Sequence, residues 1–421
     1  MQTLQAVYLI ETPLDPAHVA EVLAGEQSSG TFVRVAGETD ALRARSRATV
    51  DRVDELDPVD TPSLPNALLT RQGRGGPYRR ARISVSFPIA NIGHNLTTLA
   101  ATVAGNLYDL GEATGVRLER LTIPRPFRDR FERPRHGVHG TRALTGAAEG
   151  PLVGTIIKPN VGLSATQTAE LVATLCEAGV DFIKDDEVCA DSEHAPIALR
   201  VPAVMDRVRR WQDRSGKRVM VAFNISDEHE AMLRHAELIE REGGCCAMVS
   251  LNWCGYSSVQ ALRRRTSLAI HGHRNGYGMY SRHPALGMDF QPYQLMWRLA
   301  GVDHLHVHGL QGKFSQPDDE VVASAIDCLT PLTDADDAAD RVMPAFSSGQ
   351  WAGTVPATLR VVPSGDLLFM AGGGILAHPG GPGAGVTSIR QAWAAARAGI
   401  ALADAARHAP ELRDALAFFA R

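Results

Sequence analysis

The sequence predicts an α/β protein in which a C-terminal parallel (β/α)₈ TIM barrel, residues 126–421, follows an N-terminal α+β open-sheet domain, residues 1–125. Two observations predict this fold class. Beyond the predicted boundary, short apolar runs alternate with amphipathic helical segments, which is the pattern of a parallel barrel. Before it, strand patterns are interleaved with only two helical segments, which is typical of a small open sheet.

The elements of the N-terminal domain follow from periodicity and capping. A helix is expected after Asp15, because an aspartate side chain can cap the first helical turn. The expected strands are residues 6–12, 31–35 and 79–91, the expected helices are residues 15–27 and 94–110, and residues 73–80 are expected to form a loop.

The elements of the barrel alternate regularly along the chain. The first helix shows the signals most clearly, with Ser164 as a cap and a glycine stop at its end. The expected strands lie within residues 150–159, 180–187, 217–226, 245–253, 267–274, 302–309, 341–349 and 366–374. The expected helices lie within residues 164–179, 195–216, 228–244, 257–267, 289–301, 318–329, 354–363 and 386–399.

The bulk composition argues against several classes of function. The formal net charge is −4, so a basic surface that binds nucleic acid is not expected. The sequence shows no signal-peptide pattern and no apolar stretch of about 18 residues, so we expect a cytoplasmic protein without a membrane partner. The six cysteines include no C-x-x-C pair, which argues against a zinc or redox motif.

Polar side chains gather where the expected barrel strands end. In a parallel barrel these ends meet on one face, and that face carries the active site. The residues concerned are Lys158; Lys184, Asp185, Asp186 and Glu187; His271, His273 and Arg274; His304, His306 and His308, with Lys313 in the following loop; Ser348 and Gly349; and Gly372, Gly373 and Gly374.

The segment FIKDDE, residues 182–187, is the most informative of these strand ends. Alternation along the strand turns Lys184 and Asp186 inward, with Glu187 past the bend. Carboxylates at this spacing suit Mg²⁺, and a lysine can join them as a ligand only after CO₂ converts its amine into a carbamate. An internal ion pair between Lys184 and the neighbouring acids explains the same spacing, and spacing alone leaves both interpretations open.

Six ordered segments resemble the RuBisCO large-chain family. They are GTIIKPNVGLS (154–164), DFIKDDE (181–187), HGHR (271–274), DHLHVHGLQGK (303–313), SSGQ (347–350) and GGGILAHPGG (372–381). In the N-terminal domain, EQSSGTF (26–32) and GN (105–106) resemble family segments that complete the site of a neighbouring subunit. Because six motifs in one order are far more specific than a single glycine-rich turn, the chain is identified as resembling RuBisCO-like proteins over nearly its whole length.

The resemblance implies a role for each matching residue. It implies Mg²⁺ as cofactor, with CO₂ bound as a carbamate on Lys184. It also implies a homodimer, or a multiple of dimers, and a small phosphorylated sugar-derived substrate. The implied roles are Lys184, Asp186 and Glu187 as metal ligands; Lys158 as general acid/base; His273 as a group that orients the substrate; Lys313 on a mobile loop; Arg274, His306 and Ser348 at one phosphate site; Gly349, Gly372 and Gly373 at the other; and Glu26 and Asn106 donated by the partner chain.

Departures from the family pattern indicate that the chain is not a ribulose-bisphosphate carboxylase. Asn160 replaces the second lysine of the Lys-Pro-Lys motif, and an amide supplies neither a cation nor a proton near neutral pH. Phe32 and Tyr277 replace a tryptophan and a histidine, and the segment after Lys313 reads FSQPDDE. The resemblance therefore implies a non-carboxylating, type IV member of the family.

The best interpretation is a lyase: a 3-oxo-isoapionate-4-phosphate decarboxylase of apiose catabolism, which forms an enediolate when CO₂ is lost from a β-keto acid. A sibling that cleaves the same substrate hydrolytically remains an alternative, as does an enolase or isomerase of methionine salvage that acts on a methylthio-sugar phosphate. A binuclear metallohydrolase is a more distant alternative, in which the HGH and HVH segments and a carbamylated Lys184 would bind zinc. A non-catalytic binding barrel would not require five charged residues at the strand ends.

Overall fold

The computed structural model describes residues 2–30, 35–333 and 338–420; Phe32 and most of the strand expected at residues 31–35 lie outside these ranges. The chain divides into two compact units. The N-terminal unit consists of Met1–Glu132, Gly276–Ala300 and Leu332–Asp337, and the barrel unit consists of Arg133–Asn275, Gly301–Pro331 and Ala338–Arg421. The domain boundary expected between residues 125 and 126 stays a prediction.

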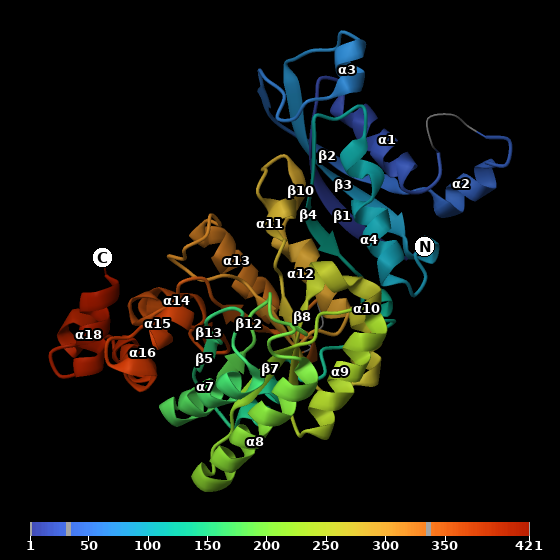
Figure 1. The fold of residues 1–421 in the computed structure, drawn as a ribbon. Helices are drawn as coiled ribbons and strands as arrows, with labels where there is room; N and C mark the ends of the chain where they lie inside the picture. Colours follow the sequence, from blue (N-terminus) through green and yellow to red (C-terminus); the bar gives the residue numbers. More distant parts are fainter. Residues whose placement is uncertain (1, 31–34, 334–337, 421) are drawn as a thin grey trace. The chain divides into compact units, whose positions relative to one another are not determined.

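The N-terminal unit is built on an open five-stranded sheet with the order β10-β4-β1-β3-β2 (Figure 1). β10 runs parallel to β4, and the other neighbours are antiparallel. In β3 the buried Ala81, Ile83 and Val85 alternate with polar residues, which gives the sheet one apolar face. The strands are β1 (Thr3–Thr12), β2 (Thr49–Val59), β3 (Tyr78–Pro88), β4 (Gly115–Thr122) and β10 (Leu286–Met288).

A distant segment of sequence, Gly276–Ala300, belongs to this unit. Arg117 on β4 holds it, because its guanidinium donates to Asp289 Oδ1 at 2.7 Å and to the carbonyl of Leu286 at 3.0 Å. The helix expected within residues 289–301 forms here, although its periodicity alone suggested a place in the barrel alternation. The helices of the unit are α1 (Pro16–Glu26), α2 (Asp40–Ser46), α3 (Ala67–Arg71), η1 (Ile89–Asn91), α4 (Leu96–Ala104), η2 (Asn106–Asp109), α5 (Arg125–Arg128), α11 (Gly278–Ser281) and α12 (Phe290–Leu299).

The barrel unit contains a closed barrel of eight parallel strands in the order β11-β12-β13-β5-β6-β7-β8-β9. Each strand lies within one of the eight predicted strand segments, so the predicted (β/α)₈ barrel and the separate open-sheet domain are confirmed. The strands are β5 (Leu152–Ile156), β6 (Phe182–Lys184), β7 (Met220–Asn224), β8 (Cys246–Ser250), β9 (Ala269–His273), β11 (His304–His306), β12 (Met343–Phe346) and β13 (Leu368–Met370).

Local capping defines the barrel helices as the sequence predicts. Ser164 Oγ accepts from the backbone N–H of Gln167 at 3.2 Å, and the Gln167 side chain accepts from the Ser164 N–H at 2.9 Å, which together form a capping box. The helices are α6 (Gly137–Thr145), α7 (Ala165–Ala178), α8 (Ile197–Ser215), α9 (His229–Arg241), α10 (Leu251–Arg265), α13 (Asp318–Leu329), η3 (Ala338–Asp340), η4 (Ala352–Thr354), α14 (Val355–Val361), α15 (Gly372–Leu376), α16 (Gly381–Arg397), α17 (Leu402–Ala405) and α18 (Pro410–Phe419).

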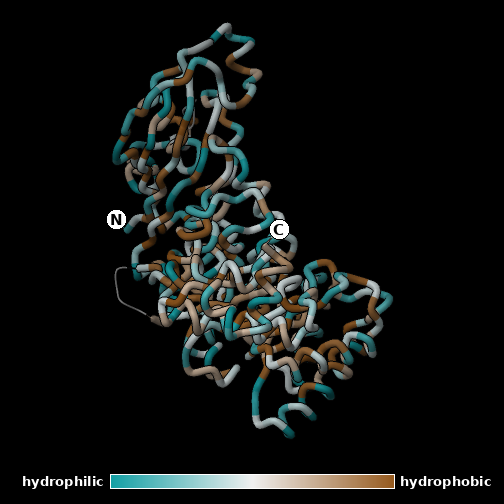
Figure 2. Tube along the Cα trace, turned by 90° about the vertical axis from the view of Figure 1, so that its left-hand side faces the viewer, coloured by the Kyte–Doolittle hydropathy of each residue, from teal (hydrophilic) through white to brown (hydrophobic). Residues whose placement is uncertain are grey.

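Large and small side chains share the apolar core of the barrel. Phe182, Met220 and Met248 pack in one buried cluster with Ala222 and Ala269, so the barrel interior is filled rather than open. Along the trace, apolar segments are short and alternate with polar ones (Figure 2). Within the described ranges, no helix is both long enough and apolar enough to cross a membrane.

Candidate active site

The end of β6 holds the densest group of charges in the candidate site. Lys184, Asp185 and Asp186 are all at most 2% exposed. Asp185 is held by the protein itself, because it accepts from Arg200 at 3.2 Å and from the backbone N–H of Asn224 at 2.9 Å. Asp185 is therefore part of the supporting structure, and Asp186 and Glu187 are the carboxylates of this segment proposed as metal ligands.

Lys184 lies among these carboxylates as an amine that gives up its proton easily. Its Nζ donates to the carbonyl of Asp185 at 2.7 Å and lies 3.8 Å from Glu187 Oε2. Burial lowers the pKa of Lys184 to about 8, although the neighbouring carboxylates act in the opposite direction. A neutral amine is the form that reacts with CO₂, so the geometry is compatible with both the carbamate and the ion-pair interpretation.

Lys158 follows β5 and already pairs with one of the proposed metal ligands. Its Nζ lies 2.6 Å from Asp186 Oδ2 and donates to Asn160 Oδ1 at 2.7 Å. The side chain is 39% exposed, so a substrate can reach it. The amide that replaces the family lysine thus holds Lys158. A Cβ at Gly372 would lie 4.0 Å from Lys158 Cε, which places the glycine turn after β13 beside this amine.

His273 closes the group from β9. Its Nδ1 accepts from the backbone N–H of Asn275 at 3.2 Å, and its Nε2 lies 3.6 Å from Glu187 Oε2. Burial lowers the pKa of His273 to about 3, so the ring is neutral at physiological pH. With Nδ1 accepting, the ring proton is on Nε2, and His273 is a neutral hydrogen-bond donor.

The donor set of this group fits a hard divalent cation. Asp186 and Glu187 supply carboxylate oxygens, and a carbamate on Lys184 would add a third anionic oxygen, which is the set that Mg²⁺ prefers. The ammonium of Lys158 pairs with Asp186 and balances the charge of this carboxylate, which a bound cation would also do. The predicted roles of these residues remain proposals.

The predicted phosphate residues lie at the ends of β9, β11 and β12. Arg274 donates to Gln316, and the backbone N–H of Lys313 donates to the carbonyl of Ser348 at 3.0 Å. Ser348 and Gly349 both have a positive φ, 71° and 91°, so this turn presents its backbone in a conformation that favours glycine. The Lys313 side chain is exposed and lies over the Phe314 ring at 5.2 Å.

The second glycine turn is open. A Cβ at Gly373 would meet no atom within 4 Å, and Gly372 would make only ordinary contacts, so a ligand can approach the backbone closely. The sequence analysis placed these glycines at the end of the last strand, and the structure places them in the first turn of α15.

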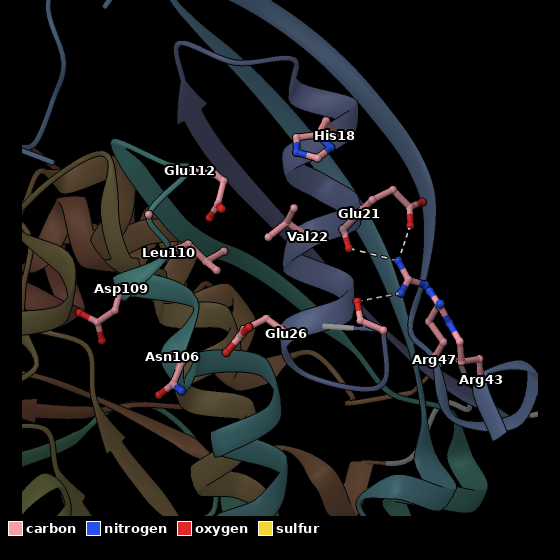
Figure 3. A pocket seen from close by; sticks show the side chains of 12 residues that line it. His18, Glu21, Val22, Glu26, Arg43, Arg47, Asn106, Asp109, Leu110 and Glu112 are labelled. Carbon is pink, nitrogen blue, oxygen red and sulfur yellow. Dashed lines mark hydrogen bonds and ion pairs between the residues drawn. The ribbon is translucent and has the colours of Figure 1, made fainter. Parts of the chain in front are cut away.

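Glu26 and Asn106 belong to the N-terminal unit. Both are exposed, and both line one pocket of about 580 Å³ (Figure 3). Glu26 ends α1 and Asn106 begins η2, so a helix end and a short turn bring together two residues that are distant in sequence. They line one surface of their own unit, and their action in the site of a partner chain stays a prediction.

Sequence reasoning missed Asn224, which supports the site. The Asn224 side chain donates to the carbonyls of Asp186 and Glu187, both at 3.1 Å, and so fixes the backbone of the proposed ligands. A polar residue that closes the apolar run VAFN was the available signal. Tyr277, one of the departures from the family pattern, lies in the N-terminal unit, where its hydroxyl donates to the carbonyl of Met288 at 3.2 Å.

The histidines of the HGH and HVH segments do not join a group of metal-ligating side chains. In the described part of the chain, the only group of three or more His, Cys, Asp or Glu side chains with ligand atoms within 4.8 Å is Asp191, Asp227 and His235. Its closest pair, His235 Nε2 and Asp227 Oδ2 at 3.1 Å, is an ordinary hydrogen-bonded pair at the surface. The metallohydrolase interpretation therefore gains no support from the geometry.

Comparison with known proteins decides the family. The profile described as "Ribulose bisphosphate carboxylase large chain, catalytic domain" matches residues 137–419, and the profile of the N-terminal domain matches residues 3–127. The chain belongs to the RuBisCO large-chain family. This finding confirms the resemblance drawn from the six sequence motifs.

Two relatives within the RuBisCO large-chain family are named for one substrate. The 3-oxo-isoapionate-4-phosphate transcarboxylase/hydrolase of Xanthobacter autotrophicus is 48% identical over 418 residues, 99% of each chain. The 3-oxo-isoapionate-4-phosphate decarboxylase of Rhizobium rhizogenes is 40% identical over 419 residues, 99% of this chain and 98% of its own.

Solved structures of the RuBisCO large-chain family share the fold. A RuBisCO-like protein from Burkholderia fungorum is 66% identical, with a TM-score of 0.95 over the full length of both chains. The octameric RuBisCO of Pyrococcus horikoshii is 27% identical, with a TM-score of 0.86 over 99% of this chain and 93% of its own. This member of the family is thus a RuBisCO-like enzyme.

Proposed function

We propose that this protein is a Mg²⁺-dependent enzyme that breaks a carbon–carbon bond of 3-oxo-isoapionate 4-phosphate, a phosphorylated keto-sugar acid. One observation carries the proposal. Lys158, Lys184, Asp186, Glu187 and His273 come together at one end of the barrel, in a chain whose full-length relatives are named for this substrate. The transcarboxylase/hydrolase of Xanthobacter autotrophicus is 48% identical to this chain, and the decarboxylase of Rhizobium rhizogenes is 40% identical.

The cation would be held by Asp186, Glu187 and a CO₂ carbamate on Lys184. When bound, Mg²⁺ supplies positive charge that stabilises the negative charge developing on the substrate oxygens during cleavage. Asn224 keeps the backbone of both carboxylates in place from behind. Lys158 pairs with Asp186 through Oδ2, so a cation held by that oxygen would release the Lys158 ammonium for the substrate.

Lys158 would act as the general acid. When the carbon–carbon bond breaks, its electron pair moves into the adjacent ketone and leaves an enediolate, and the carbon must then take a proton. The ammonium of Lys158 can supply this proton, and Asn160 holds the amine by the hydrogen bond at 2.7 Å. The neutral His273 donates its Nε2 proton to a substrate oxygen, which orients the ketone without adding a charge.

The single phosphate group of the substrate would bind at one of two sites. Gly349, Gly372 and Gly373 supply one site with backbone that can approach an anion closely, and Arg274 and Ser348 supply the other with a cation and a hydroxyl. The backbone hydrogen bond from Lys313 to Ser348 connects the loop after β11 to the turn after β12, so a bound phosphate would favour the loop position that covers the substrate.

Two outcomes of the cleavage are candidates. The sequence analysis favours the decarboxylase, whereas the higher identity, 48% against 40%, favours the transcarboxylase/hydrolase, and we rank that reaction first. The two differ in the fate of one carbon. A decarboxylase releases the carboxyl carbon as CO₂, and a transcarboxylase/hydrolase retains it in an acid product.

The deciding experiment follows that carbon. Substrate labelled with ¹³C at the carboxyl group is incubated with enzyme, Mg²⁺ and bicarbonate, and the products are followed by NMR and by trapping of CO₂. Label in a non-volatile acid supports the transcarboxylase/hydrolase, and label in CO₂ supports the decarboxylase. If the substrate survives while a methylthio-pentulose phosphate is isomerised or enolised, the proposed substrate is wrong.

The proposal includes a homodimer, or a multiple of dimers, in which Glu26 and Asn106 act in the partner's site. Relatives described as octameric and dimeric RuBisCOs support it. Co-expression of Glu26→Gln and Lys184→Ala chains under two affinity tags tests it. The purified heterodimer has one intact site, so it should regain about half of the wild-type activity per dimer, whereas each variant homodimer stays inactive. An inactive heterodimer contradicts the shared site.

A further inference from the structure

A chain of hydrogen bonds between buried side chains runs through the barrel interior. It links the turn after β12 to α6. Ser347 Oγ contacts His306 Nδ1 at 3.1 Å, and His306 Nε2 contacts His271 Nε2 at 2.7 Å. His271 Nδ1 contacts His304 Nδ1 at 3.3 Å, and His304 Nε2 contacts Thr141 Oγ1 at 2.7 Å. All five side chains are buried.

The hydrogen bond at the Thr141 end of this chain can have only one direction. The Thr141 hydroxyl donates to the carbonyl of Gly137, because a carbonyl oxygen can only accept. A hydroxyl has one proton, so Thr141 Oγ1 must accept in its second contact. The ring of His304 therefore carries its proton on Nε2 and donates to Thr141.

The direction passes from ring to ring because each neutral imidazole has one donor and one acceptor. Burial keeps the rings neutral: it lowers the pKa of His304 to about 4 and the pKa values of His271 and His306 well below the usual range. With Nε2 of His304 donating, its Nδ1 accepts from His271 Nδ1. His271 Nε2 then accepts from His306 Nε2, and His306 Nδ1 accepts from the hydroxyl of Ser347.

We propose that these side chains form a one-way hydrogen-bond relay and that His306 is a positioning residue that sets the hydroxyl of Ser347 instead of binding the substrate phosphate. Both ring nitrogens of His306 are engaged by buried partners, so it has no proton left to donate to a phosphate oxygen. This assignment departs from the role that the family resemblance implies for His306. The identity of the phosphate as ligand rests on the proposed function.

The relay controls Ser348 through Ser347. The proton of Ser347 goes to His306, so Ser347 Oγ can only accept in its contact with Ser348 Oγ at 3.4 Å. Ser348 Oγ therefore donates its proton to Ser347 Oγ, and this hydrogen bond must break before Ser348 can donate to a phosphate. A relay of opposite direction would let Ser347 donate to Ser348 and would leave the Ser348 proton free for the phosphate.

Neutron diffraction from crystals of the deuterated wild-type protein tests the relay directly. We expect deuterons on Nε2 of His304, Nδ1 of His271 and Nε2 of His306, and none on Nδ1 of His306. A deuteron on His306 Nδ1, or on both nitrogens of any of the three rings, overturns the proposal. This readout needs no substrate, so its result stays separate from the success of the proposed function.

The variants Thr141→Val and Thr141→Ser form a matched pair. Valine keeps the shape but removes the acceptor, so the three rings should reverse their tautomers, and serine should preserve them. Inorganic phosphate should then bind Thr141→Val about 2- to 10-fold more tightly in calorimetry, the range of one neutral hydrogen bond, and bind Thr141→Ser like the wild type. Loosened packing would weaken binding instead. Unchanged or weaker binding to Thr141→Val overturns the link to Ser348.

Discussion

The barrel unit buries two polar groups in two different ways. Around Lys184 the polar groups are charged: the buried Asp186 lies 2.6 Å from the Lys158 amine, and the half-buried Glu187 lies 3.8 Å from the buried Lys184 amine. Along the histidine relay the buried groups are neutral, and every contact is a hydrogen bond. Burial is costly for a charge and much less so for a paired neutral group.

This difference teaches what each group can do. The charged group changes its pairing when a cation or CO₂ arrives, because Lys158 and Lys184 can each exchange a carboxylate partner for another. The neutral relay has a single set of histidine tautomers that lets Thr141 accept the last hydrogen bond. Its hydrogen bonds therefore keep one direction, and its rings do not titrate near neutral pH. The charged group suits chemistry, and the neutral one suits alignment.

The largest effect should follow the removal of Lys184. Lys184→Ala deletes the amine that takes up CO₂, so activity should fall at least about 10³-fold, since the loss of an electrostatic group of a reaction centre typically costs 10²–10³-fold and the cation site is lost with it. Turnover at saturating Mg²⁺ and bicarbonate is the measurement. The exposed Lys217→Ala serves as the matched control and should keep wild-type turnover. Wild-type turnover of Lys184→Ala would show that no carbamate is needed.

Replacement of Lys158 should separate chemistry from cation binding. Lys158→Met removes the general acid, so kcat should fall about 10²- to 10⁴-fold. Because Asp186 loses its ion-pair partner, Mg²⁺ should bind the variant at least as tightly as the wild type in calorimetry. A variant that loses both turnover and Mg²⁺ affinity would mean that Lys158 holds the site together instead of supplying a proton.

Most of the fold could be predicted from the sequence. The barrel strands are short, apolar and end in polar residues, so local patterns identify all eight. The place of residues 276–300 could not be predicted, because it depends on the pairing of β10 with β4 and on Arg117, which are contacts over more than 150 residues of sequence. Periodicity describes a helix but does not say which sheet it packs on.

The candidate site shows the same limit. The sequence predicts Lys158, Lys184 and Asp186 because their types and spacing carry the chemistry. The sequence gives no reason to connect Thr141 with His304, because Thr141 lies before the first barrel strand and His304 lies in β11. The role of His306 also depends on which nitrogen carries the proton, and that follows from hydrogen-bond partners alone.

The pH dependence of activation should report the charged group alone. The lowered pKa of Lys184, about 8, means that the neutral amine becomes more abundant as pH rises through 8. At constant dissolved CO₂, the initial rate of activation should rise roughly tenfold between pH 7 and pH 9 and level off above that, because it follows the neutral fraction of an amine with such a pKa. His273 and His304, with pKa values of about 3 and 4, should contribute no step in this range. A step near pH 6.5 would indicate a titrating histidine and would break the comparison between the two groups.

The smallest effect should come from Asn160, the residue that replaces the family lysine. Its side chain accepts one hydrogen bond from Lys158 at 2.7 Å and is exposed, so Asn160→Ala should lower kcat only about 2- to 10-fold, the range of one hydrogen bond, and leave KM nearly unchanged. Asn160→Asp keeps an acceptor in the same place and should restore most of the loss. Asn160→Lys places a second cation beside Lys158, and we expect it to lower activity on the keto-sugar acid without fixing labelled CO₂ on ribulose 1,5-bisphosphate, because the loop after Lys313 also differs from that of carboxylases. Label fixed by Asn160→Lys would show that this single amide separates the two chemistries. An effect of Asn160→Ala as large as that of Lys158→Met would show that the amide itself contacts the reacting atoms.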